Sequence, residues 1–156
     1  MAPVMIFKFL HIAAMFTAVA ISFGPAVLLR FAARGGKVRS IQGVAETAIS
    51  LSRFIAPVFI LGLIFGLTTA LLGGFNFLAP WLLIAYVLFV AGTVVGALGE
   101  GRFTSEVATA AAANPGDEPG PALTGVLSAP RADLVFWLFT AIVVALIFDM
   151  VIKPFT

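Results

Sequence analysis

The chain has 156 residues, of which 62% are hydrophobic and 10% are charged, and its formal net charge is +2. Water-soluble domains have roughly 45–50% apolar and about 25% charged residues, so this composition excludes a soluble globular fold and favours an integral membrane protein with membrane lipid around it. The small net charge gives no reason to expect nucleic acid as a partner, and the lack of cysteine in the sequence excludes disulfides and thiolate metal sites.

Four apolar segments follow one another along the chain, each of about 18–21 residues. A helix of that length rises by ~1.5 Å per residue and spans the roughly 30 Å hydrocarbon core of a membrane. The sequence therefore predicts a single domain over residues 1–156, an all-α integral membrane bundle of four transmembrane helices. The predicted helices cover approximately residues 9–29, 54–72, 81–98 and 134–152.

The connections between these segments differ in composition. Residues 40–53 carry apolar side chains at helical spacing opposite polar ones, which predicts a short amphipathic helix at the cytoplasmic interface, running into the second span. The connection from Gly73 to Pro80 is short, so the second and third helices are expected to be antiparallel neighbours. Residues 114–127 are rich in proline and glycine, which predicts a flexible cytoplasmic linker.

Lysine and arginine are unevenly divided between the two sides of the predicted bundle. Seven of them lie in the two long connections, between the first and second helices and between the third and fourth. The other two, Lys8 and Lys153, lie on the side of the termini. Because cytoplasmic loops are enriched in basic residues, we expect both long connections in the cytoplasm and both termini outside.

Two Gly-x-x-x-Gly pairs fall within predicted helices, Gly62 with Gly66 in the second and Gly92 with Gly96 in the third. Glycines at this spacing allow the backbones of two helices to approach closely. Packing within the bundle is the simpler interpretation. Contact with a second copy in a homodimer, or with a larger membrane complex, is the alternative.

His11 is the only histidine of the sequence, and it lies near one end of the first apolar segment. At helical spacing it shares a face with Lys8 and Met15. Ionisable groups at membrane depth tend to have functional roles, so His11 is a candidate ligand of a b-type haem or of copper. The alternative is an interfacial histidine bonded to a neighbouring helix or a lipid headgroup. Lys8 is either an interfacial anchor or a partner for a haem propionate.

The fourth predicted helix brings further polar and sulfur-bearing side chains to the side of the membrane that holds His11. Met15 and Met150 supply thioethers that suit Cu(I) together with an imidazole, and Met150 is also a candidate second axial ligand of a haem. Asp149 is expected either to accept the second ring N–H of His11 or to pair with Lys153, four residues later on the same helix.

Lys8-Phe9-Leu10-His11, followed by Gly24-Pro25 and Arg30, resembles the first helix of a group of small bacterial four-helix membrane proteins. The group includes the membrane domain of copper-resistance protein D, the HemJ-type protoporphyrinogen oxidases and allied predicted integral membrane proteins of unknown function. The closing run of residues 149–154 is most similar to this last, uncharacterised branch.

The resemblance implies a function that involves haem, porphyrin or copper. In this resemblance His11 matches the histidine of the group's first helix, and Lys8 matches the lysine three residues before it. HemJ-type enzymes resemble one another in a tryptophan after that histidine and in a lysine on the third helix. This chain lacks both, and its third predicted helix carries Tyr86.

Three functional hypotheses follow from these observations. The first is a b-type haem or copper site at the outer membrane face that serves redox chemistry or metal handling. The second is a non-catalytic accessory or assembly subunit of a membrane complex, whose polar cluster is structural. The third is HemJ-like porphyrin oxidation. The sequence contains no serine–histidine–acid set, phosphate-binding glycine loop or carboxylate pair that would identify catalytic residues.

Overall fold

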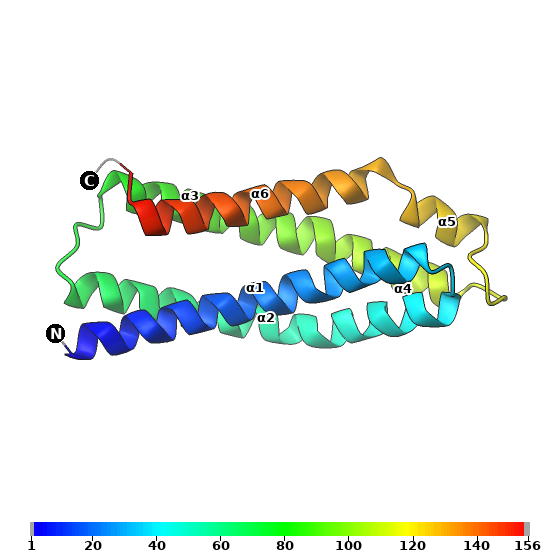
Figure 1. Ribbon diagram of the computed structural model, residues 1–156, viewed down its shortest axis with the longest axis horizontal. Helices are drawn as coiled ribbons and strands as arrows, with labels where there is room; N and C mark the ends of the chain where they lie inside the picture. Colours follow the sequence, from blue (N-terminus) through cyan, green and yellow to red (C-terminus); the bar gives the residue numbers. More distant parts are fainter. Residues whose placement is uncertain (1, 155–156) are drawn as a thin grey trace.

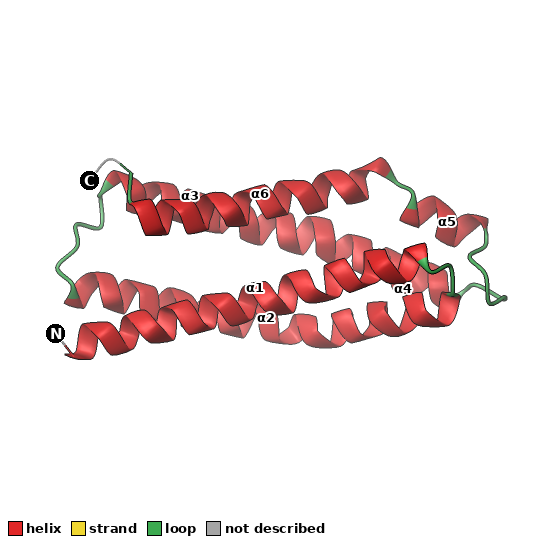
Figure 2. Ribbon diagram, viewed as in Figure 1, coloured by secondary structure: helices red, strands yellow, loops and turns green. Residues whose placement is uncertain are grey.

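The protein is described by a computed structural model that covers residues 2–154, in which every regular element is helical (Figure 1, Figure 2). A short π-helical segment, η1, joins α3 to α4, so that the three form one long rod. The elements in chain order are α1 (Ala2–Arg34), α2 (Val38–Leu72), α3 (Pro80–Val95), η1 (Gly96–Glu100), α4 (Gly101–Ala112), α5 (Pro121–Leu127) and α6 (Pro130–Ile152).

Four stretches of the described chain are long and apolar enough to cross a membrane: α1, α2, the α3–η1–α4 rod, and α5 taken with α6. This confirms the predicted all-α fold with four membrane-spanning helices. The described chain begins and ends at the same end of the bundle, where the connection between α2 and α3 also lies (Figure 1). We call this the terminal end, and the opposite end, which holds α5, the loop end.

The bundle consists of two antiparallel helix pairs. The helix α1 packs along α2, and α3 packs along α6, while α2 also packs against α4 near the loop end. Aromatic side chains join the two pairs between these contacts. The ring of Phe23 on α1 stacks on Phe139 of α6 at a centroid distance of 5.0 Å, and Phe59 of α2 meets Phe89 of α3 at 5.7 Å.

The glycine pairs are located within these helix contacts. A Cβ atom at Gly92 would lie 3.3 Å from the side chain of Ile142, and one at Gly96 would lie 3.2 Å from the ring of Phe139, both on α6. Gly62 and Gly66 are close to α1 in the same way, as described below. Both pairs therefore serve packing within the bundle, which was the simpler of the two interpretations.

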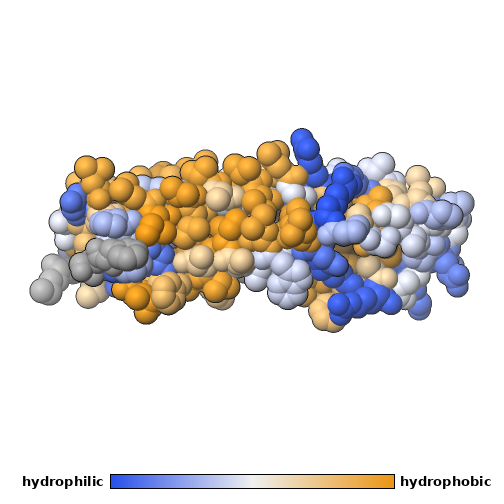
Figure 3. Space-filling model, turned by 90° about the horizontal axis from the view of Figure 1, so that it is seen from above, coloured by the Kyte–Doolittle hydropathy of each residue, from blue (hydrophilic) through white to orange (hydrophobic). Residues whose placement is uncertain are grey.

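The helices are longer than the membrane requires. On α1, Arg30 follows Lys8 by 22 residues, which corresponds to about 33 Å and matches the hydrocarbon thickness, yet α2 alone has 35 residues, or about 52 Å. Figure 3 shows a broad hydrophobic surface that ends at a belt of hydrophilic side chains toward one end of the molecule. The helices extend beyond the apolar belt at the loop end.

This extension has a core of its own, which we call the loop-end core. It gathers buried apolar side chains from α1, α2, α4, α5 and α6. In the membrane-spanning part, by contrast, large apolar side chains lie on the surface, where lipid would cover them. The loop-end core consists of Leu29, Val38, Ile41, Ala45, Phe103, Val107, Ala111, Leu123 and Ala132.

The predicted amphipathic helix over residues 40–53 forms, but it is not a separate element at the membrane surface. It is the first part of α2, and its side chains Ile41 and Ala45 are fully buried in the loop-end core. The apolar face of residues 40–53 therefore packs against other helices. This burial stabilises the part of the helix outside the membrane, and α2 continues through Gly43 and Pro57 into the membrane.

The predicted linker over residues 114–127 contains a turn followed by a short helix. Its second half forms α5, and the side chain of Leu123 is fully buried in the loop-end core. Its first half is a turn held by Asn114, whose Oδ1 accepts the N–H of Gly120 at 2.7 Å and whose Nδ2 donates to the carbonyl of Gly116 at 2.7 Å. Proline and glycine here shape a turn and start a helix.

Candidate functional site

His11 lies on α1 and is directed toward α2. Its Nδ1 is 2.7 Å from the carbonyl oxygen of Gly62. A carbonyl oxygen can only accept a hydrogen bond, so Nδ1 carries the proton and donates it. In the neutral ring the lone pair then resides on Nε2. The backbone of α2 thus selects one tautomer of the imidazole and leaves Nε2 as its basic nitrogen.

The side chains of His11 and Met15 both pack on the two glycines of α2, Gly62 and Gly66, which we call the glycine face. A Cβ atom at Gly66 would lie 2.7 Å from Nδ1 and 2.8 Å from Cε1 of His11. A Cβ atom at Gly62 would lie 2.5 Å from Sδ of Met15. The face shared by the imidazole and the thioether, expected from their spacing, is therefore the face that α1 presents to α2.

Lys8 and Met150 are the other two candidate cofactor-binding residues. Lys8 is exposed on α1, one turn before His11, and takes part in none of the ion pairs formed among the described residues. Met150 is half-buried on α6. No group of three or more His, Cys, Asp or Glu side chains comes together in residues 2–154, so a metal held here would depend on His11 and the thioethers.

Asp149 on α6 is 3% exposed, and neither of its carboxylate oxygens has a hydrogen-bond partner among the described residues. The expected hydrogen bond from His11 is not formed, and Nδ1–H of that ring is bonded to Gly62 instead. A buried carboxylate without a partner is rare in proteins, and it identifies Asp149 as a group whose partner is a ligand, a proton or a water molecule.

The expected ion pair between Asp149 and Lys153 is also not formed. The helix α6 ends at Ile152, and Lys153 adopts a left-handed backbone conformation with φ of 49°. Its ammonium group therefore turns away from the helix surface and lies 4.7 Å from the ring centre of Phe75 and 5.1 Å from that of Trp81. Lys153 is held by cation–π contacts in place of the carboxylate.

His11 and Asp149 lie at similar heights in the bundle. Arg30 of α1 donates to the carbonyl oxygen of Ala132 on α6 at 2.9 Å, which fixes one common level. From that level His11 is 19 residues away along α1 and Asp149 is 17 residues away along α6. These separations correspond to about 28 Å and 26 Å, so the two side chains differ in height by less than one helical turn.

A second polar site, at the border of the loop end, centres on Arg30. Its guanidinium forms a two-pronged ion pair with Glu100, with N–O distances of 2.8 and 3.3 Å. It also donates to the carbonyls of Ala26 and Ala132, and its Cζ lies 4.1 Å from the ring centre of Phe136. This cluster joins α1 to the rod and to α6, so it fastens the two helix pairs together.

Glu100 was not identified as a site residue from the sequence. It is the last residue of η1, and π-helical segments often occur at functional positions. The available signal was a charge of each sign directly after the first and the third apolar segments, Arg30 and Glu100, on what topology predicts to be the same side of the membrane. Opposite charges at one membrane border are natural partners.

Comparison with known proteins agrees with this architecture. Residues 5–154 match the model of a family described as a predicted integral membrane protein family, DUF2269. No match is found among curated proteins or among solved structures. The match extends over nearly all of the chain and includes both polar sites. The chain therefore belongs to the DUF2269 family of predicted integral membrane proteins.

Proposed function

We propose that this membrane protein binds a copper ion near the terminal end, with Nε2 of His11 as its principal ligand, and serves metal handling or electron transfer. The observation that carries the proposal is the 2.7 Å hydrogen bond from Nδ1 of His11 to the carbonyl of Gly62. Histidines that bind metals almost always donate their other ring N–H to a carbonyl or carboxylate in this way, which fixes the tautomer and raises the basicity of the ligating nitrogen.

The neighbouring donors fit copper. Met15 lies one turn from His11 on the same face of α1, and its Sδ packs on Gly62 while the imidazole packs on Gly66, so neighbouring turns of one helix face supply a nitrogen and a sulfur donor. Imidazole and thioether together suit Cu(I). On α6, Met150 is a further candidate thioether, and the unpartnered carboxylate of Asp149 would offset the charge of the ion. Bound copper supplies one-electron transfer, and the chain contributes the ligands and the fixed imidazole tautomer.

A b-type haem is the second candidate, because Nε2 of a histidine with a fixed tautomer is also the atom that ligates haem iron. Lys8, exposed one turn before His11, would then pair with a propionate. We also infer kinship with copper-resistance protein D and the HemJ-type enzymes, supported by the Lys8-to-His11 motif. The resemblance to small bacterial membrane proteins supports a bacterial cytoplasmic membrane, and the distribution of Lys and Arg supports an orientation with the terminal end outside.

The test is a titration of the metal-free, detergent-purified protein with Cu(I) in competition with a chromophoric chelator. We expect one bound ion per chain, loss of that binding in His11→Ala, and at least about tenfold weaker binding in Met15→Leu. Met5→Leu, on the exposed surface of the same helix, is the matched control and should bind as the unchanged protein does.

The outcomes separate the hypotheses. Equal copper binding by the unchanged protein and by His11→Ala would refute the copper site. A Soret band in the purified protein that His11→Ala lacks would assign haem in its place. A protein that binds neither copper nor haem would leave the accessory-subunit role, in which His11 and Asp149 are structural.

A further inference from the structure

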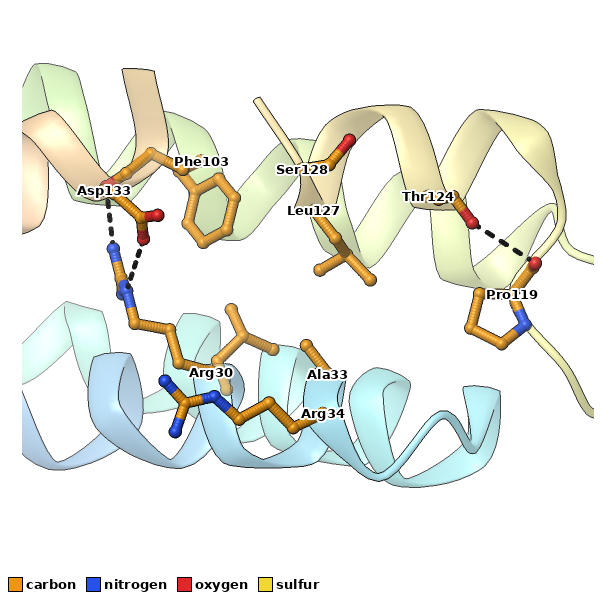
Figure 4. Close-up of a pocket in the computed structure, with 11 residues that line it drawn as sticks. Arg30, Ala33, Arg34, Phe103, Pro119, Thr124, Leu127, Ser128 and Asp133 are labelled. Carbon is orange, nitrogen blue, oxygen red and sulfur yellow. Dashed lines mark hydrogen bonds and ion pairs between the residues drawn. The ribbon is translucent and has the colours of Figure 1, made fainter. Parts of the chain in front are cut away.

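An open cavity of about 420 Å³ lies between α1, α4, α5 and α6, next to the Arg30 cluster (Figure 4). Arg30 and Arg34, one turn apart on α1, line one side of it, and Thr124 and Leu127 of α5 lie on the opposite side (Figure 4). Asp133, in the first turn of α6, lines it as well. The cavity thus has a mixed polar and apolar lining, with two guanidinium groups along one wall.

The two arginines have hydrogen-bonding capacity that the chain does not use. Nε of Arg30 is buried and has no hydrogen-bond partner among residues 2–154, and an oxygen of Asp133 lies 4.0 Å from it. The guanidinium of Arg34 takes part in no ion pair within the described part of the chain and lies 5.6 Å from the ring centre of Phe31. An arginine N–H left unpaired in a buried position is unfavourable, so an anion that accepts from it would be stabilised.

The position of the cavity indicates the source of that anion. Arg30 lies about 33 Å along α1 from Lys8, at the far limit of the hydrocarbon core. Leu28 and Phe31, beside the two arginines, are exposed apolar residues that acyl chains would cover. Figure 3 shows the hydrophobic surface ending at a hydrophilic belt. A cavity at this level opens where the phosphates of the lipid headgroups lie.

We propose that this cavity binds the phosphate headgroup of an anionic phospholipid, with Arg34 and Nε of Arg30 as the donors. Arg34 suits this role because its planar guanidinium pairs with two phosphate oxygens at once, and Nε of Arg30 donates one further hydrogen bond. Asp133 weakens the binding of an anion, because its carboxylate is directed at the same Nε. The side chain of Asp133 is 81% exposed. The headgroup displaces this weak contact, so removal of the Asp133 charge strengthens binding. The site is independent of the copper proposal.

The test uses the full chain in detergent, titrated with phosphatidylglycerol, phosphatidylcholine or inorganic phosphate and followed by native mass spectrometry. Phosphatidylglycerol is expected to bind in preference to phosphatidylcholine. Arg34→Gln should weaken phosphatidylglycerol binding about fivefold, the effect of one basic residue at a charged membrane surface. Arg53→Gln removes an exposed arginine of α2 outside the cavity and should leave binding unchanged, while Asp133→Asn should tighten it.

Two results would overturn the proposal. One is equal binding of the two lipids, which would mean that the phosphate is not selected by charge. The other is the same change in Arg34→Gln and Arg53→Gln, which would reflect a general loss of positive charge. If inorganic phosphate binds with the affinity of phosphatidylglycerol and displaces it, the ligand is free phosphate and the lipid assignment is wrong.

Discussion

Replacing Arg30 with alanine is expected to lower the free energy of unfolding by about 3–5 kcal/mol, because removal of one member of a buried ion pair leaves the other charge uncompensated. The side chains of Arg30 and Glu100 are only 18% and 11% exposed. The substitution also removes the donors to the carbonyls of Ala26 and Ala132 and the contact with the ring of Phe136. Reversible unfolding in mixed micelles, followed by circular dichroism, measures the loss.

The matched control is the ion pair between Arg131 and Glu106, whose side chains are 66% and 40% exposed. Arg131→Ala should change stability by at most about 1 kcal/mol, since exposed pairs contribute little. The double variant Arg30→Met with Glu100→Leu should recover much of the stability lost in Arg30→Ala. Equal effects of Arg30→Ala and Arg131→Ala would contradict the role of Arg30 in fastening the two helix pairs.

Gly66→Ala is expected to destabilise the protein by about 1–3 kcal/mol, because the added methyl group must displace a rigid ring. It would stand 2.7 Å from Nδ1 of His11, and moving that ring also lengthens the hydrogen bond to the carbonyl of Gly62. Gly62→Ala should have a smaller effect, since its methyl group meets the flexible thioether of Met15. The same unfolding measurement, together with Cu(I) affinity, reports both.

Gly43→Ala provides the control for helix propensity. Gly43 belongs to the same helix, and a methyl group added there would have no other side chain or neighbouring helix within 4 Å. The substitution should therefore raise stability by about 0.5–1 kcal/mol. If Gly66→Ala raises stability as Gly43→Ala does, the imidazole is not seated on the glycine face and the account of the His11 site is wrong.

The sequence predicted the helical architecture because an apolar run of membrane length has one stable form in lipid. It also predicted that a helix over residues 40–53 runs into the second span, but it predicted neither the start of that helix at Val38 nor the helix α5. The start of α2 at Val38 and the helix α5 both depend on burial in the loop-end core, where Ile41 and Leu123 are inaccessible to solvent. That burial joins segments far apart in the chain, and local composition does not specify it.

The arrangement of the candidate site could likewise be predicted only in part from the sequence. Spacing on one helix predicted that His11 and Met15 share a face, and both side chains pack against α2. The partner of His11 is a backbone carbonyl, that of Gly62, and which carbonyl it meets depends on the register between α1 and α2. The ion pair expected between Asp149 and Lys153 assumed a helix continuing through Lys153, but the left-handed conformation of Lys153 ends it.

The most direct test of the proposed copper site is X-ray absorption spectroscopy of the purified protein loaded with one equivalent of Cu(I). The account predicts a first coordination shell that contains both imidazole nitrogen and thioether sulfur, with the imidazole signal lost in His11→Ala. A shell without imidazole, or a spectrum that His11→Ala leaves unchanged, would contradict the assignment of His11 as the ligand.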